Sequence, residues 1–204
     1  MMSKTHIAIG TATSLAICAP TTVGGIFSAV MGGMIGGILC DIECRSTPKM
    51  RDALHGRVIV AVVTAGILLA DWFLKTGIWN SILSRERFFL IFGAAVLLGT
   101  CTIGRFSDHR TFTHSLLFVL LIDFGCFCII PDLLLPVLAG GLSHLFIDTL
   151  NKKPVPWLYP IRKNGICFKL CYADNIGNAV LMWLGVAAST ALLFWRIIII
   201  SGKY

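Results

Sequence analysis

Long runs of apolar residues, separated by short polar connections, organise this chain from end to end. A helix that crosses a bilayer needs about 20 mostly apolar residues. By that measure the pattern predicts membrane helices at residues 5–19, 23–40, 58–74, 88–103, 113–130, 133–150 and 176–200. The first run is short for a complete crossing, so the expected count is about seven. The connections hold no repeat and no long polar insertion. We therefore expect one domain over residues 1–204 with an all-α fold, a polytopic transmembrane helical bundle.

The composition agrees with this pattern. Hydrophobic residues make up 56% of the chain and charged residues 13%, and the mean hydropathy is +0.85. A soluble globular domain carries roughly twice that charged fraction. The sequence therefore indicates an integral membrane protein and excludes an ordinary soluble enzyme.

Lys and Arg residues are divided unequally between the two sides that the predicted helices define. The net charge is +7, which in a soluble protein would suggest a nucleic-acid partner. In a membrane protein, the placement of these charges reports topology first, because basic residues collect on the cytoplasmic side. If the N-terminus is cytoplasmic, twelve basic residues lie on the cytoplasmic side and four on the other. We therefore expect a cytoplasmic N-terminus, a periplasmic C-terminus and no nucleic-acid partner.

Glycines recur at helical spacing in the second apolar run. Gly32 with Gly36, and Gly33 with Gly37, are four residues apart, and such pairs allow two helix backbones to approach closely. Gly140 leaves similar room for a close neighbour in a later helix. These positions predict tight helix packing.

Histidines and carboxylates are concentrated beside the apolar runs. Two short stretches hold three of the five histidines: DHRTFTHS contains His109 and His114, and HLFID contains His144. An ionisable group in or near the bilayer core is costly and usually faces the bundle interior or a watery cavity. These stretches are therefore candidates for a functional site.

His144 and Asp148 are four residues apart on a predicted helix, so both side chains project from one face and can hold one metal ion. An isolated pair of this kind has a structural alternative, in which His144 bonds a helix neighbour and Asp148 pairs with Lys152. The candidate metal ligands on one rim of the predicted bundle are His6, Asp41, His109, His114, His144 and Asp148. Imidazoles and carboxylates suit zinc first, with iron or manganese as alternatives, and the set is large enough for one or two ions.

Three further residues are candidates for catalytic roles. Arg110 presents a planar, permanently charged fork that suits a phosphate or carboxylate. Asp108 can accept a hydrogen bond from an imidazole and orient it. Glu43 is a further carboxylate on the same rim. Thr111 or Thr113 is expected to cap the helical turn that holds His114.

Several of these pieces, taken in order along the chain, match a known pattern. They are Thr5-His6, Asp41-Ile42-Glu43, the HRTFTHS block that begins at His109, His144-Leu145-Phe146-Ile147-Asp148 and Trp157-Leu158-Tyr159-Pro160. With them the chain resembles the YdjM-like family of bacterial inner-membrane proteins, described as LexA-regulated, membrane-bound, metal-dependent hydrolases. The chain departs from the family pattern at Glu43, where a second Asp is common. The resemblance implies a location in the bacterial inner membrane and a hydrolase activity that depends on a divalent metal.

Three functions fit these residues. The first is a metal-dependent hydrolase that cleaves an ester or phosphoester of a lipid or of another membrane-associated substrate. The second is a transporter in which the same cluster binds a metal ion or relays protons, with the intramembrane Asp123 on the path. The third is a non-catalytic membrane protein whose polar rim docks a partner. Membrane lipids are expected partners in each case, and assembly of several copies is compatible with the sequence.

Overall fold

The computed structural model describes residues 2–43, 47–108, 110–170 and 176–202. Within those ranges the regular elements are helices. One isolated antiparallel β-bridge, between Val155 and Ile166, also occurs there. In chain order the elements are α1 (Ser3–Cys18), α2 (Val23–Leu39), η1 (Cys40–Glu43), α3 (Thr47–Leu74), α4 (Ile78–Leu83), α5 (Arg87–Phe106), η2 (Phe112–His114), α6 (Leu116–Ile129), η3 (Pro131–Leu133), α7 (Leu134–Thr149) and α8 (Ile176–Ser201). The all-α prediction is confirmed.

Each predicted apolar run contains a helix, but the helices differ in length. Among the described residues, five segments are long and apolar enough to cross a membrane: Val23–Glu43, Met50–Leu74, Arg87–Phe106, Pro131–Thr149 and Ile176–Ser201. The helices α1 and α6 have 16 and 14 residues. At 1.5 Å per residue they reach about 21 to 24 Å, which is less than the roughly 30 Å of a bilayer core. The structure therefore supports five spans, and the predicted count of about seven is not confirmed.

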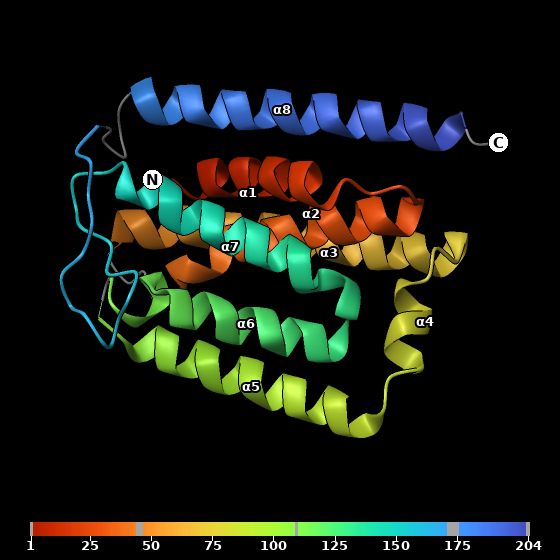
Figure 1. Cartoon of the computed structure of the whole chain (residues 1–204), viewed down its shortest axis with the longest axis horizontal. Coiled ribbons are helices and arrows are strands. Elements are labelled where there is room, and N and C mark those ends of the chain that lie inside the picture. Colours follow the sequence, from red (N-terminus) through yellow and green to blue (C-terminus); the bar gives the residue numbers. More distant parts are fainter. Residues whose placement is uncertain (1, 44–46, 109, 171–175, 203–204) are drawn as a thin grey trace.

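The helices α1, α2 and α7 form the centre of the bundle. In Figure 1 they lie roughly parallel, with α8 along one side and α6 and α5 along the other. The helix α2 packs against α1 and α7, α1 also packs against α7 and α8, and α5 pairs with α6. This arrangement brings the start of α1 beside the end of α7.

Glycines allow the central helices to approach this closely, as the sequence predicted. A Cβ atom on Gly37 would lie 2.6 Å from the carbonyl oxygen of His6, and one on Gly140 would lie 2.5 Å from that of Gly33. A side chain at either position would therefore collide with the backbone of the neighbouring helix. The first contact joins α2 to α1, and the second joins α7 to α2.

Asp71 occupies a structural position at the opposite end of the bundle, where Figure 1 shows α4. Its carboxylate accepts hydrogen bonds from the backbone N–H of Ile78 at 3.1 Å and of Trp79 at 2.8 Å, and from the hydroxyl of Thr76. These bonds satisfy N–H groups in the first turn of α4, which lack partners within the helix. The buried carboxylate thus holds the turn between α3 and α4.

Candidate metal centre

Five side chains with metal-ligand chemistry converge at the end of the bundle where α1 begins and α7 ends. Ligand atoms of His6, His144 and Asp148 lie within 4.8 Å of one another, and the same holds for Asp41, His114 and His144. The three histidines are completely buried, and Asp148 and Asp41 are 2% and 8% exposed. The chain segments that supply them are α1, η1, η2 and α7, so four separate elements build one cluster.

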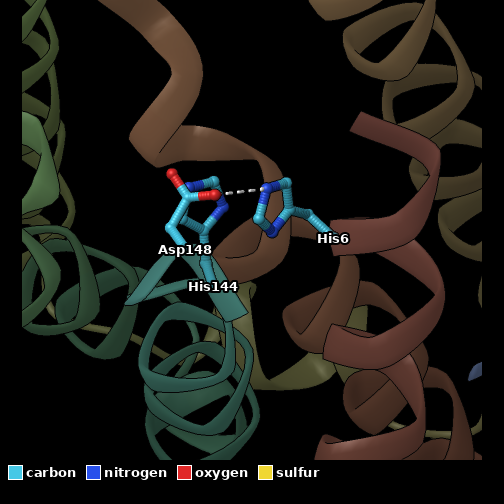
Figure 2. A group of neighbouring side chains, drawn as sticks. All are labelled: His6, His144 and Asp148. Carbon is cyan, nitrogen blue, oxygen red and sulfur yellow. Dashed lines mark ion pairs between the residues drawn. The ribbon is translucent and has the colours of Figure 1, made fainter. Parts of the chain in front are cut away.

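The first triad shows why a spacing of four residues on α7 matters. His144 and Asp148 project from the same face of α7, as predicted, and His6 reaches them from α1 (Figure 2). The imidazoles of His6 and His144 are stacked with their centroids 3.7 Å apart, and Nε2 of His6 lies 3.4 Å from Oδ1 of Asp148. Asp148 thus contacts a side chain of another helix.

The tautomer of His144 follows from its contact with α2. Its Nδ1 lies 2.8 Å from the carbonyl oxygen of Gly37. A carbonyl can only accept, so Nδ1 carries the proton, and in the neutral ring Nε2 carries the lone pair. This Nε2 is buried and has no hydrogen-bond partner among the described residues. A buried acceptor without a partner is costly, and a cation at that nitrogen would remove the cost.

His114 is held between carboxylates. Its Nε2 lies 3.2 Å from Oδ2 of Asp148 and 3.9 Å from Oδ1 of Asp41, and its Nδ1 lies 3.2 Å from Oε1 of Glu43. Burial by itself would lower the pKa of His114, but hydrogen bonds to Asp148 and Glu43 and the charges of both carboxylates raise it to about 9. Without a metal ion, the ring is therefore a cation at neutral pH.

Glu43 lies behind His114 rather than facing the other ligands. Besides Nδ1 of His114, it contacts the backbone N–H of Arg110, which donates to its Oε1 at 2.6 Å, and the hydroxyl of Thr113, which donates to its Oε2. Glu43 thus links η1 to η2 and sets the orientation of the imidazole. The participation of Thr113 was missed by sequence reasoning, although its position directly before His114 was an available signal.

Thr111 is the N-cap residue of η2, the turn that holds His114, but the side-chain capping bond predicted for Thr111 or Thr113 is not formed by Thr111. Ser115 is the N-cap of α6, and its hydroxyl accepts from the backbone N–H of Phe118 at 3.2 Å. The hydroxyl of Thr111 instead donates to the carbonyl of Asp108. The hydroxyl of Thr113 donates to Glu43.

Arg110 connects the cluster to the segment that follows α7. One guanidinium nitrogen lies 2.8 Å from Oδ2 of Asp148, and the other donates to the carbonyl of Lys153 at 2.6 Å. Its Nε is buried without a hydrogen-bond partner among the described residues. The charged fork that the sequence suggested therefore lies at the candidate metal site, against the carboxylate of Asp148.

The remaining predicted residues lie outside the cluster or outside the described chain. Asp108 is exposed. His109 falls outside the described residues, so its role as a ligand and the orienting role of Asp108 stay predictions. Asp123 is buried in α6 and belongs to neither triad.

Comparison with known proteins agrees with the resemblance read from the motifs. A model of the YdjM inner membrane protein family matches residues 1–202, essentially the whole chain. The chain belongs to this family. The YdjM family name specifies an inner membrane protein, in agreement with the five membrane-length helices of the described residues. No curated protein and no solved structure matches the chain.

Proposed function

We propose that this YdjM family protein is a membrane-embedded, metal-dependent hydrolase that cleaves an ester or phosphoester of a lipid or membrane-associated substrate. The observation that carries the proposal is the buried Nε2 of His144, which has no hydrogen-bond partner among the described residues and belongs to the one imidazole that both triads share. Two further imidazoles and two carboxylates surround it in a buried site. Zinc is the expected ion, and iron or manganese also fits this donor set.

The geometry favours one ion over two. Both triads include His144, and its Nδ1 is already engaged with the carbonyl of Gly37. Only Nε2 remains, and one imidazole nitrogen binds one metal ion. A single ion at Nε2 can draw its other ligands from His6, Asp41, His114 and Asp148, which is more than the three protein ligands usual for catalytic zinc.

The protein's own groups supply the rest of the chemistry. A divalent ion in this site would make water a nucleophile at neutral pH and polarise an ester or phosphoryl oxygen. Arg110 carries a permanent positive charge beside Asp148 and would hold an anionic group of the substrate. Glu43 keeps a proton on Nδ1 of His114 and so directs Nε2 of the same ring toward the other candidate ligands. The surrounding helices exclude bulk water, which strengthens each of these charge interactions.

The proposal is tested by measuring the metal content of the protein and then its hydrolytic activity. Detergent-purified wild type, His144→Ala and His55→Ala are analysed by inductively coupled plasma mass spectrometry, with His55→Ala as the control because His55 is exposed on α3. We expect about one ion per chain in wild type and control and none in His144→Ala. The same three proteins are then screened against ester and phosphoester lipids in vesicles. Absence of metal after reconstitution, or full hydrolysis by His144→Ala, would contradict the proposal.

Transport remains a second candidate because of Asp123. Its Oδ1 is buried in α6 and lacks a hydrogen-bond partner among the described residues, as expected for a carboxylate on an ion path. Against this, Asp71, the buried carboxylate at the opposite end, is used as a helix cap. Uptake of zinc or manganese into proteoliposomes distinguishes the two functions, since a hydrolase should show none.

A further inference from the structure

We propose that the loop of residues 151–170, which follows α7, is a binding surface for anionic phospholipid headgroups of the leaflet next to the metal cluster. This surface is a property of the loop itself. It does not depend on metal binding or on hydrolysis, so it stands or falls separately from the proposed function.

The loop is positively charged. The loop contains five basic residues and no acidic residue. All five are exposed: Lys152, Lys153, Arg162, Lys163 and Lys169. At this end of the bundle the carboxylates of Asp41, Glu43 and Asp148 are buried in the cluster, whereas Asp108 is exposed. The exposed charge of the loop itself is therefore entirely positive, and a positive surface next to a membrane attracts anionic lipid.

The loop also exposes large apolar side chains. The side chains of Ile161, Leu170 and Phe168 are 88%, 72% and 56% exposed, and they alternate along the loop with the basic residues. In water such side chains would be an unfavourable patch. At a bilayer surface they can insert among the headgroups while their basic neighbours contact phosphates. A purely electrostatic contact with a soluble acidic partner would not need them.

Backbone hydrogen bonds hold the loop in place at the C-terminal end of α7. The N–H of Phe168 donates to the carbonyl of Thr149 at 2.7 Å, and that of Leu170 donates to the carbonyl of Leu150 at 2.9 Å. The N–H of Leu116, at the start of α6, donates to the carbonyl of Trp157 at 2.9 Å. Figure 1 shows the loop beside the ends of α6 and α7, at the opposite end of the bundle from α4. The mixed surface is thus fixed beside the C-terminal end of α7 and the N-terminal end of α6.

The test compares charge removal at the two ends of the bundle. The loop variant is Arg162→Gln/Lys163→Gln, and its matched control is Lys75→Gln/Arg87→Gln, which removes one exposed Lys and one exposed Arg at the α4 end. Each protein is reconstituted in nanodiscs of phosphatidylcholine with phosphatidylglycerol, and native mass spectrometry counts the phosphatidylglycerol molecules that stay bound after release. We expect wild type and control to retain them and the loop variant to lose most of this retention.

A second measurement needs no variant. Hydrogen–deuterium exchange of peptides from residues 151–170 of the wild type is compared in discs with and without phosphatidylglycerol. We expect slower exchange with the anionic lipid. The proposal is overturned if the loop variant retains as much phosphatidylglycerol as wild type, if the control loses as much as the loop variant, or if exchange is the same in both discs. Neither measurement requires bound metal or turnover.

Discussion

Nδ1 of His144, on α7, lies 2.8 Å from the carbonyl oxygen of Gly37, on α2. This contact between residues 107 positions apart determines which nitrogen of the imidazole is left for a metal ion. Gly37 has a second role, since its missing side chain allows α1 to bring His6 against the same ring. One glycine thus positions two of the three histidines.

Replacing Gly37 by Ala should therefore disturb both the packing of α1 against α2 and the arrangement of the candidate metal ligands. The new Cβ would lie 2.6 Å from the carbonyl of His6, and forcing α1 away should cost about 1–3 kcal/mol of stability. We expect a melting temperature lower by several degrees in detergent and reduced metal content. The matched control is Gly66→Ala, because a Cβ there meets nothing within 4 Å. Equal melting temperatures for the two variants would refute this account of Gly37.

Glu43→Gln should weaken metal binding without removing a ligand from either triad. The amide keeps the size of the side chain but loses the charge that holds the proton on Nδ1 of His114. Loss of such an orienting partner typically costs about 10- to 100-fold in metal affinity. Competition with a fluorescent chelator measures the effect, and Glu86→Gln, at an exposed residue before α5, serves as the control. Unchanged affinity in Glu43→Gln would show that Glu43 does not position His114.

Metal affinity should rise with pH. Because the pKa of His114 is raised to about 9, the ring is protonated at neutral pH, and an ion that binds Nε2 must displace one proton. Below that pKa the association constant should increase about tenfold per pH unit, and it should level off as pH approaches 9. Isothermal titration calorimetry in buffers of different ionisation enthalpy should detect about one proton released per ion at pH 7. A flat profile between pH 6 and 8 would mean that His114 is not a ligand.

The charge of Arg110 should affect the binding of substrate rather than the binding of the metal ion. Arg110→Gln removes the cation beside Asp148 but no metal ligand, so metal content should persist. If the guanidinium holds an anionic group, KM for an anionic lipid ester should rise by about 10- to 100-fold, equivalent to the loss of one charged hydrogen bond. Arg51→Gln, at an exposed residue of α3, is the control. An identical KM in both variants would remove Arg110 from substrate binding.

Local spacing along the chain was sufficient to predict much of this protein. The apolar runs predicted the helices, since burial in lipid requires continuous apolar segments with satisfied backbones. The spacing of four between His144 and Asp148 predicted their shared face, because helix periodicity alone sets it. The glycines of α2 likewise predicted its close packing. Each of these features depends on residues within a single apolar run or a single helix.

Tertiary structure decided what depends on residues far apart. It brought His6 to His144, placed Glu43 behind His114 and set Arg110 against Asp148. It also left α1 and α6 shorter than a bilayer, although their apolar runs resembled spans. No local pattern contains this information, because a hydroxyl or carboxylate binds whichever donor or acceptor the packed helices bring to it. The chain sequence determined the types of the candidate ligands, and the packing of α1, α2 and α7 determined which of their atoms meet.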